Sequence, residues 1–438
     1  MLAKPDICEE GHNLNVYTWR RAVACILPLA LAAPAMAQQA GNTGLLGDWG
    51  GLRPALAAHG VTIGITDSEN LLGNLSGGVK TGATMQGLTS MTMSVDTGKA
   101  IGLPGGTFYV SALQLHGRSL SPYYLDTLQT ANGNEGDNAT RLWEAWYDQA
   151  FLGGKFDIKL GQQSIDNEFI DSAYSALFVN TMAGWPIVPS ADLYGGGPAY
   201  PLSSLGVRGQ FKPNGNTAVL AGVFDDDPGA GPFNADQQAL DPRGGRFSLK
   251  NGALWIAELQ YSAKPFGLPG TYKFGGWYDS ANFVDELYGY NHRGNYSLYG
   301  VVDQTVWQSV ADSNRSLNVF GRIMGAPSDR NIVDLGFNGG VTLSAPLPGR
   351  DNDQAGLDIG VAHVSARTAD ADAAAGLPRQ GTEILFEATY QAQATPWLVL
   401  QPDVQYVVNP AGGIDNPNGS GKRIGNELVA GLRAVVMF

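Results

Sequence analysis

The chain has 438 residues and a formal net charge of −13 at pH 7, with a sequence pI near 4.8. This acidity excludes electrostatic binding of nucleic acid, because phosphate backbones are held mainly by Lys and Arg. Hydrophobic residues make up 44% of the chain, but no segment after residue 37 is apolar for long enough to form a membrane-spanning helix.

The first predicted element is an export signal. Two arginines precede the apolar run 22–37 (AVACILPLALAAPAMA), which is too short to span a bilayer and ends in an A-x-A cleavage signature. We predict that residues 1–37 are a signal peptide or leader removed on export. Both cysteines of the chain, Cys8 and Cys25, lie in this segment, so the exported chain suits an oxidising compartment.

Residues 38–60 are predicted to be an N-terminal periplasmic segment. Pro54 is suited to the first turn of a helix and Gly60 to its end, which favours one short helix between them. A plain linker is the alternative.

Sixteen segments of alternating polarity follow, and each is predicted to be a β-strand. In KFDIKLGQ, for example, Phe156, Ile158 and Leu160 alternate with charged residues. One strand is ambiguous, because Arg141 and Glu144 have opposite phase and one of them is expected near a rim. The predicted strands lie near 61–70, 83–96, 106–116, 140–150, 155–164, 205–212, 216–224, 254–262, 271–279, 295–308, 316–324, 331–344, 355–365, 382–393, 397–408 and 426–438.

The connections between these strands alternate in length. Compact turns rich in Gly and Pro follow the fourth, sixth, eighth and fourteenth strands, whereas long segments follow the third, fifth, seventh, ninth, thirteenth and fifteenth. Short periplasmic turns and long outer loops are typical of outer-membrane barrels. We therefore predict an all-β fold, a transmembrane antiparallel β-barrel of about 16 strands over residues 61–438, with a water-filled lumen. A soluble sandwich is disfavoured, because charged residues recur on one face of many strands.

The last strand ends the chain. In NELVAGLRAVVMF, Leu428, Leu432 and Phe438 share one face, and Glu427 and Arg433 share the other. An apolar face opposite a charged one suits a wall between lipid and water. Phe438 is predicted to face lipid at the periplasmic side of the membrane. Other aromatic residues are expected in the membrane girdle: Trp143, Trp146, Trp255, Tyr261, Trp307, Tyr390, Trp397 and Tyr406.

Three segments carry a family resemblance: LLGDWGGLRPALAAHGVTI (45–63), RLWEAWYDQAFLGGKFDIKLGQQSIDNEF (141–169) and EILFEATYQAQATPWLVLQPDVQYVVNPAGG (383–413). Together they resemble the carbohydrate-selective outer-membrane porins of the OprB type. The resemblance implies a sixteen-stranded barrel in the bacterial outer membrane that passes glucose and related sugars by facilitated diffusion. It also implies an inward-folded loop that narrows the pore, a role that would fall on 165–204, with Asp166, Asp171, Trp185 and Asp192.

The resemblance also implies partners for this protein. The expected partners are carbohydrate substrates, outer-membrane lipid and lipopolysaccharide, and a barrel-assembly machinery for which Phe438 would serve as a signal. Whether the barrel is a monomer or a homotrimer is left open.

Candidate pore-lining residues follow from strand phase. A sugar needs hydrogen-bond partners that replace its hydration yet release it again. Arg supplies a planar fork of donors, and carboxylates and amides supply acceptors. Trp185 in the long segment is the candidate for stacking on a sugar ring. Bracing of the barrel wall by ion pairs is the alternative role for the inward residues, which are Arg208, Arg322, Arg433, Glu258, Glu383, Glu387, Asp403, Gln405, Lys155, Asp157 and Lys159.

No catalytic residue, metal ligand or cofactor is predicted. The sequence has no GxSxG elbow, P-loop or HExxH motif, and its histidines are scattered. The predicted function is passive diffusion of glucose-like mono- or disaccharides. A non-selective general diffusion porin is the first alternative and an outer-membrane hydrolase the weaker one. An actively driven, plugged transporter would need about 22 strands and a plug domain.

Overall fold

The computed structural model describes residues 44–419 and 421–438. The predicted leader, residues 1–37, and the first part of the predicted N-terminal segment lie outside the described residues.

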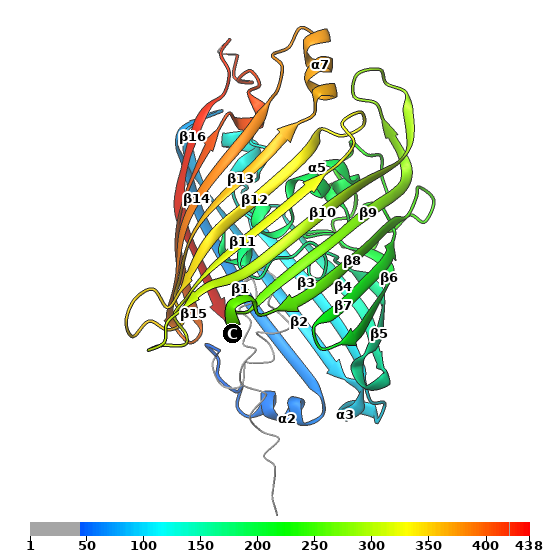
Figure 1. Ribbon diagram of the computed structural model, residues 1–438, viewed down its shortest axis with the longest axis vertical. Coiled ribbons are helices and arrows are strands. Elements are labelled where there is room, and N and C mark those ends of the chain that lie inside the picture. The colour runs from blue at the N-terminus through cyan, green and yellow to red at the C-terminus, as the bar shows by residue number, and fades with distance from the viewer. Residues whose placement is uncertain (1–43, 420) are drawn as a thin grey trace, which may run out of the picture.

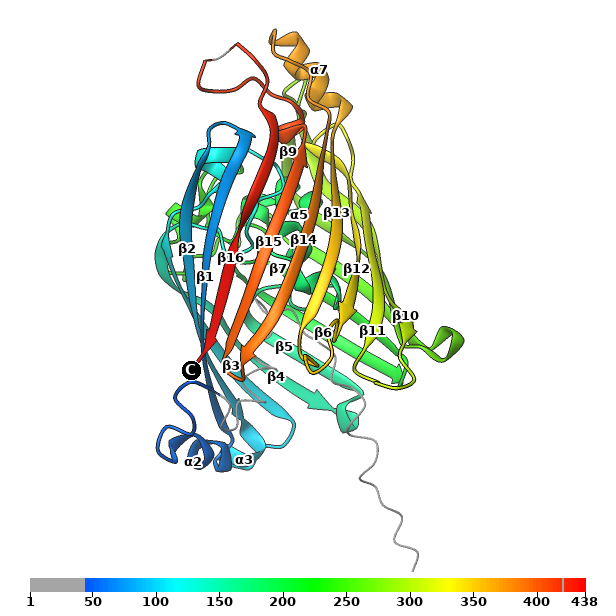
Figure 2. The same cartoon turned by 90° about the vertical axis from the view of Figure 1, so that its left-hand side faces the viewer.

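Sixteen antiparallel strands form one closed barrel, in which each strand pairs with its neighbours in sequence and β1 also pairs with β16 (Figures 1 and 2). The predicted fold class is thereby confirmed. The strands are β1 Val61–Gly78, β2 Gly82–Asp96, β3 Gly106–Gly117, β4 Ala139–Phe151, β5 Phe156–Gln163, β6 Ser204–Asn214, β7 Thr217–Phe224, β8 Leu254–Ala263, β9 Gly270–Val284, β10 Asn291–Gln308, β11 Ser316–Gly325, β12 Val333–Ser344, β13 Gln354–Val364, β14 Thr382–Thr395, β15 Leu398–Val408 and β16 Gly425–Met437.

Helices are short and lie in the connections. Helix α2 stands before β1, between the glycine-rich run that precedes it and Gly60, where the sequence favours a helix. No helix among residues 44–419 and 421–438 is long and apolar enough to cross a membrane. The α-helices are α2 Leu52–Ala58, α3 Thr97–Ile101, α4 Thr181–Gly184, α5 Ile187–Asp192, α6 Gln237–Leu240 and α7 Ala366–Ala374; the 3₁₀ or π turns are η1 Ser121–Leu125, η2 Leu152–Gly154, η3 Ser175–Leu177, η4 Tyr194–Gly196, η5 Pro265–Gly267 and η6 Pro410–Gly412.

The segment before β1 is tied to the end of the chain. The Leu45 amide donates to the Met437 carbonyl (2.8 Å), and Arg53 donates to the carbonyl oxygen of Phe438. The Phe438 amide in turn donates to the Ile65 carbonyl (3.0 Å). The closing strand therefore has partners on β1 and on α2, at the end of the barrel where both lie (Figure 2).

One end of the barrel carries the compact turns and the other the long loops, and we call them the turn end and the loop end. The connections at the loop end are L1 79–81, L2 118–138, L3 164–203, L4 225–253, L5 285–290, L6 326–332, L7 365–381 and L8 409–424. The long connection predicted after the ninth strand is wrong. β9 and β10 pair up to Val284 and Asn291, so residues expected in a loop extend the hairpin instead.

A bulge resolves the ambiguous strand. The β3–β4 register shifts between Ser111 and Ala112, so Arg141 pairs with Leu113 and Glu144 pairs with Ser111. An extra residue on one strand of an antiparallel pair reverses the phase beyond it. Arg141 and Glu144 are therefore both buried on the inner face, and neither is displaced to a rim by its phase. The bulge also buries Trp143 on the inside, against the expectation that it joins the girdle. Trp146 is also wrong as a girdle residue, because its ring stacks on the buried, inward Tyr109 with the ring centroids 4.8 Å apart, and the inward Lys159 lies over it.

Most of the remaining wall follows the predicted alternation of lipid-facing and inward residues. Outward residues such as Phe274 and Leu357 are exposed, whereas inward polar residues such as Glu258 and Arg322 are buried. The inward residues are buried because loops fill much of the lumen. The largest hydrophobic cluster joins L3 to the inner wall and includes Ile165, Phe169, Trp185, Val188, Leu220, Ile256, Trp277, Tyr299 and Met324.

Candidate functional site

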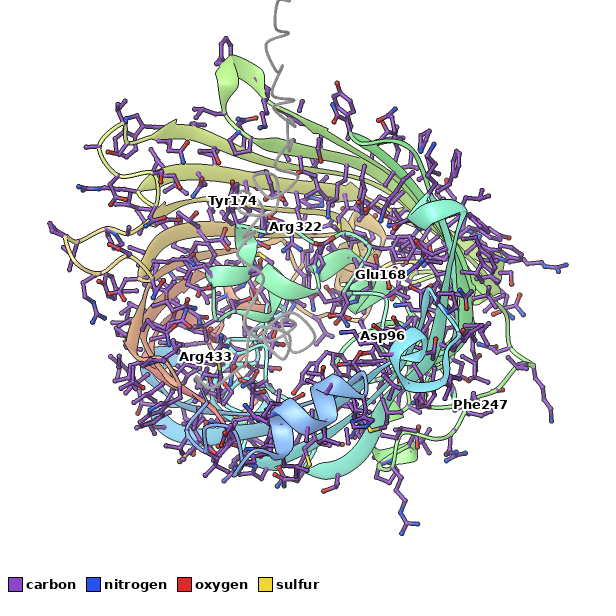
Figure 3. The ribbon with its side chains drawn as sticks, turned by 90° about the horizontal axis from the view of Figure 1, so that it is seen from below. Asp96, Glu168, Tyr174, Phe247, Arg322 and Arg433 are labelled. Carbon is purple, nitrogen blue, oxygen red and sulfur yellow. The ribbon has the colours of Figure 1, made fainter. Side chains whose placement is uncertain are left out.

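The candidate site is the interior of the barrel, where L3 and L2 fold against the wall. Seen from the turn end, Arg322, Glu168 and Tyr174 lie inside the ring of strands with the helices of L3 (Figure 3). The predicted inward segment 165–204 corresponds to L3.

Arg322 on β11 holds the middle of L3. Its side chain is only 1% exposed, and all of its donors face acceptors. The guanidinium donates to one wall side chain and to four L3 carbonyls: Asn338 Oδ1 (2.8 Å), Ile170 (3.2 Å), Met182 (2.5 Å), Ala183 (2.8 Å) and Gly184 (2.8 Å). The guanidinium group is planar and carries five N–H groups. Each of the four L3 carbonyls and the Asn338 side chain can therefore accept from a separate N–H group.

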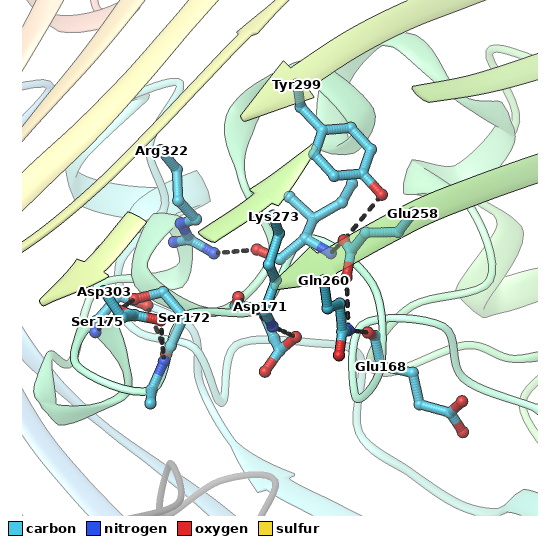
Figure 4. Close-up of polar contacts among 12 residues, drawn as sticks. Glu168, Asp171, Ser172, Ser175, Glu258, Gln260, Lys273, Tyr299, Asp303 and Arg322 are labelled. Carbon is cyan, nitrogen blue, oxygen red and sulfur yellow. Dashed lines mark hydrogen bonds and ion pairs between the residues drawn. The ribbon is translucent and has the colours of Figure 1, made fainter. Parts of the chain in front are cut away.

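Three neighbouring strands fix the start of L3 (Figure 4). Glu258 on β8 accepts from the Ile170 amide (2.8 Å) and from the Tyr299 hydroxyl (2.9 Å). Asp303 on β10 accepts from the Ser172 hydroxyl (2.5 Å) and the Ala173 amide (3.1 Å). Lys273 on β9 donates to the carbonyl of Asp171 (2.9 Å) and pairs with its carboxylate.

The far part of L3 is held by β14 and β15. Glu387 accepts from the amides of Val179 (2.5 Å) and Asn180 (3.2 Å). The Asn180 side chain donates to Gln405 (3.1 Å), and Gln401 donates to the Leu177 carbonyl (2.6 Å). Asp403 lies buried beside them and accepts from Gln405 (2.9 Å).

L2 is a second inward loop, which the sequence reasoning missed. Glu383 on β14 accepts from the amides of Leu128 and Gln129 (2.8 Å each), and Gln405 donates to the Ala131 carbonyl (2.8 Å). L2 and L3 also contact each other, through the bonds Thr181 N to Thr130 O (3.0 Å), Gly133 N to Val179 O (2.9 Å) and Asn180 Nδ2 to Gln129 O (3.1 Å).

Arg433 on β16 lies where both loops meet the wall. It donates to Asn70 of β1 (2.8 Å), to Asn132 of L2 (3.3 Å) and to the Val179 carbonyl of L3 (3.4 Å). Beside it is a small hollow of about 20 Å³ lined by Thr66, Ser68, Leu88, Ser90, Asn134, Arg433 and Val435. Hydroxyl, amide and guanidinium groups thus border a space inside the barrel.

A charged cluster lies nearer the turn end. Glu168 of L3 pairs with Lys159 of β5 and with Arg208 of β6 (Nε to Oε2, 2.5 Å), and Arg208 also pairs with Asp157. Burial alone would raise the pKa of the Glu168 carboxyl, but the charges of Lys159 and Arg208 outweigh burial and hold that pKa below its ordinary value. The carboxylate is therefore charged at neutral pH.

Two candidates occupy places that the sequence did not predict. Lys155 is exposed in the turn that precedes β5, because Gly153 and Gly154 delay the start of the strand to Phe156. Trp185 is 7% exposed, packs in the hydrophobic cluster of L3 and donates its indole N–H to the Gly196 carbonyl (2.8 Å). Its ring faces protein rather than an open path.

Lys273, Asp303 and Gln401 contact L3 but were not singled out from the sequence. All of them lie on predicted strands. Lys273 lies between the outward residues Tyr272 and Phe274, so the alternation along β9 places its side chain on the inner face. The same argument from strand phase predicts the inward position of Arg322. Among residues 44–419 and 421–438, no three His, Asp or Glu side chains come together as a possible metal site.

Comparison with known proteins agrees with this architecture. Residues 80–438 match the family model "Carbohydrate-selective porin, OprB family". Porin B of Pseudomonas aeruginosa is 25% identical, over 95% of this chain and 98% of that protein, and the putative porin QuiX of Acinetobacter baylyi is 25% identical, over 90% and 93%. The high-pH structure of Pseudomonas putida OprB superposes with a TM-score of 0.80 at 23% identity, covering 91% of this chain and 99% of that one.

The barrel provides a route across a membrane. The family match extends over the wall strands β2 to β16 and over both inward loops. The protein is a channel of the bacterial outer membrane and not an enzyme, and this chain belongs to the OprB family of carbohydrate-selective porins.

Proposed function

We propose that L2 and L3 together form the constriction through which glucose-like mono- or disaccharides diffuse, and that most of the inward charged residues act by bracing these loops. The observation that carries this proposal is Arg322, whose donors are committed to L3 and to Asn338. A side chain in this arrangement sets the position of a loop, and the loop in turn sets the width of the path.

Sugar contacts are assigned to the polar groups beside Arg433, where a hollow of about 20 Å³ admits a single water-sized group such as one sugar hydroxyl. Thr66, Ser68, Ser90 and Asn134 border it with hydroxyl and amide groups. Such groups exchange hydrogen bonds with sugar hydroxyls as readily as with water, so a sugar binds weakly at each step and is released. Arg433 adds a charged donor at the point where L2, L3 and the wall meet.

The test compares three arginines replaced singly by Ala. Arg322→Ala should free L3, raise single-channel conductance and reduce discrimination between mono- and disaccharides in liposome swelling. Arg433→Ala should alter sugar flux more than it alters conductance. Arg330→Ala is the matched control, because Arg330 lies in L6 and bonds to Asp329 and to the Gly294 carbonyl rather than to L2 or L3. Unchanged swelling and conductance in both lumen variants would contradict the proposal.

A general diffusion porin predicts a different result. Its ion current would be indifferent to glucose, maltose and similar sugars at concentrations that occupy a selective path. Current block by sugar in the unmodified protein, lost in Arg433→Ala, is the outcome expected for a selective channel.

We further infer that residues 1–37 are an export leader and that the outer wall contacts phospholipid and lipopolysaccharide. The support is the A-x-A signature ending at Ala37 and the outward apolar residues of the strands. The mass of the protein isolated from outer membranes should correspond to a chain that begins at residue 38.

A further inference from the structure

The loop end of the barrel carries a pair of aromatic rings that solvent reaches. Tyr288 and Tyr290 lie in L5, the connection between β9 and β10, and are 65% and 52% exposed. Their ring centroids are 6.0 Å apart, and the ring planes differ by only 7°. Among residues 44–419 and 421–438, no other pair of contacting rings leaves both partners exposed. Because apolar ring surface is held in water here, a ligand that covers it gains free energy.

A third ring extends the pair. The His292 imidazole lies beside Tyr290, with the ring centroids 5.0 Å apart. Tyr290 therefore stands between two neighbouring rings. We call Tyr288, Tyr290 and His292 the ring row.

The register of the β9–β10 hairpin places the ring row toward the mouth of the pore. His292 pairs with Phe283, which is buried against Tyr194 of L3 inside the barrel. Residues that lie directly opposite each other in an antiparallel pair have their side chains on the same face of the sheet. His292 therefore lies on the inner face of the wall, and Tyr290 contacts it from that side.

Asp285 fixes the shape of L5 beneath the rings. One oxygen of its carboxylate accepts from the amides of Leu287 (3.0 Å) and Tyr288 (2.7 Å), and the other lies 3.3 Å from His292 Nε2. The Asp285 amide donates to the Tyr290 carbonyl (2.8 Å). These bonds hold all three members of the ring row, so little ordering is left for a ligand to impose.

Two other loops place polar groups beside the ring row. Arg367 belongs to helix α7 of L7, which stands at the same end of the barrel (Figure 1). Its guanidinium carbon lies 4.9 Å from the centroid of Tyr288, and its Nε lies 3.8 Å from Asp285. Asp329 of L6 lies 3.7 Å from His292 Nε2. The side chains of Arg367 and Asp329 are partly exposed, so a ligand on the rings can reach both a donor and an acceptor.

This combination of groups fits a sugar ring. A pyranose has faces lined by C–H groups, which are buried when the sugar lies on an aromatic ring. The hydroxyl groups at its edge need donors and acceptors, which Arg367 and Asp329 supply. A phosphate or another anion fits poorly, because the carboxylates of Asp285 and Asp329 lie as near to the ring row as Arg367 does.

We propose that the ring row is a capture site for pyranose sugars at the loop-end mouth of the pore. This inference rests on the selective sugar path proposed above and adds an entry step to it. A weak site in front of the constriction raises the concentration of sugar there, and with it the rate at which sugar enters from the loop end. Entry from the turn end does not pass this site and keeps its rate.

The test measures the block of ion current by maltose in planar bilayers that contain no lipopolysaccharide. Maltose is added to one side at a time, and the frequency of block events gives the association rate from that side. All channels carry Leu249→Cys, because Leu249 in L4 is 73% exposed and residues 38–438 contain no other cysteine. A membrane-impermeant thiol reagent, added after the measurement, shows which side the loop end faces.

Tyr290→Ala should lower the association rate from the loop end several-fold, while the rate from the turn end and the conductance stay unchanged. Tyr290→Phe keeps the ring and should retain the rate of the parent channel. Phe247→Ala is the matched control. Phe247 lies in L4, is 46% exposed and stacks on no other ring in the part of the chain that the structure describes, so its loss should change neither rate.

The outcomes separate this inference from the function on which it rests. If maltose blocks the parent channel but Tyr290→Ala leaves the loop-end rate unchanged, the capture site is overturned and the selective path stands. Rings that serve only to contact lipopolysaccharide would give that result. An equal loss of rate from both ends would also overturn the capture site, since it indicates a change in the pore itself. If maltose blocks the parent channel from neither side, the selective path and the capture site are both overturned.

Discussion

At the scale of single residues, charged side chains of the kind that could line a sugar path instead form hydrogen bonds with the backbone of L3. Arg322, Glu258 and Glu387 each face amides or carbonyls of L3. Hydrogen bonds to charged groups contribute about 1.5–3 kcal/mol each, and a donor left unsatisfied by their loss costs a comparable amount. Sequence phase places such residues on the inner face but does not distinguish a lining role from a bracing role.

Glu168 gives a prediction at this scale. Glu168→Gln should leave Lys159 and Arg208 without their common partner, destabilise the turn-end part of L3 by about 3 kcal/mol, and raise conductance and anion selectivity. Ion selectivity in planar bilayers measures the effect. Asp370→Asn is the control, because the Asp370–Arg379 pair in L7 is about half exposed and such pairs contribute little.

The same residue predicts a pH dependence. Because the folded-state pKa of Glu168 is lowered, its contribution to stability is complete above the ordinary value near 4.5 and is lost as pH falls through the lower folded pKa. Conductance should be constant from neutral pH down to that ordinary value and change only below it. Glu168→Gln should remove this acid transition, and a transition of equal size in that variant would assign it to another group.

At the scale of elements, one strand holds both inward loops. β14 carries Glu383 under L2 and Glu387 under L3, and the loops also bond to each other. Because the loops support one another, replacing both glutamates should change the free energy that holds the loops in place by an amount that differs from the sum of the two single changes.

A double-mutant cycle tests this coupling. Glu383→Ala should expose L2 to protease and Glu387→Ala should expose L3, and each should raise conductance. In the double variant, the changes in protease sensitivity and in conductance should differ from the sums of the changes in the two single variants. Gln391 lies nearer the turn end on the same face of β14, and Gln391→Ala should change neither protease sensitivity nor conductance. Strict additivity would indicate that the loops are held independently.

At the scale of the whole molecule, closure of the barrel depends on the last strand. β16 pairs with β15 and β1, and its terminal Phe438 bonds to Ile65 and to Arg53 of α2. Phe438→Ala should reduce the amount of heat-modifiable barrel in outer membranes several-fold, because an interfacial aromatic anchor and the expected assembly signal are lost together. Val436→Ala, on the same outward face, should assemble normally. Normal assembly of both variants would remove the special role assigned to Phe438.

The sequence alone determined the number of strands, their phase and the inward side of residues such as Arg208, Arg322 and Arg433. These properties are local, because alternation along one strand and the turns at its ends specify them. It did not determine that L2 folds inward, that a bulge buries both Arg141 and Glu144, or that Trp185 packs inside L3. Those facts depend on contacts such as Glu383 with Leu128 and Arg322 with Met182, between residues far apart in the chain. Only closure of the barrel brings such residues together, so the tertiary structure decided which charges brace the loops and which border the path.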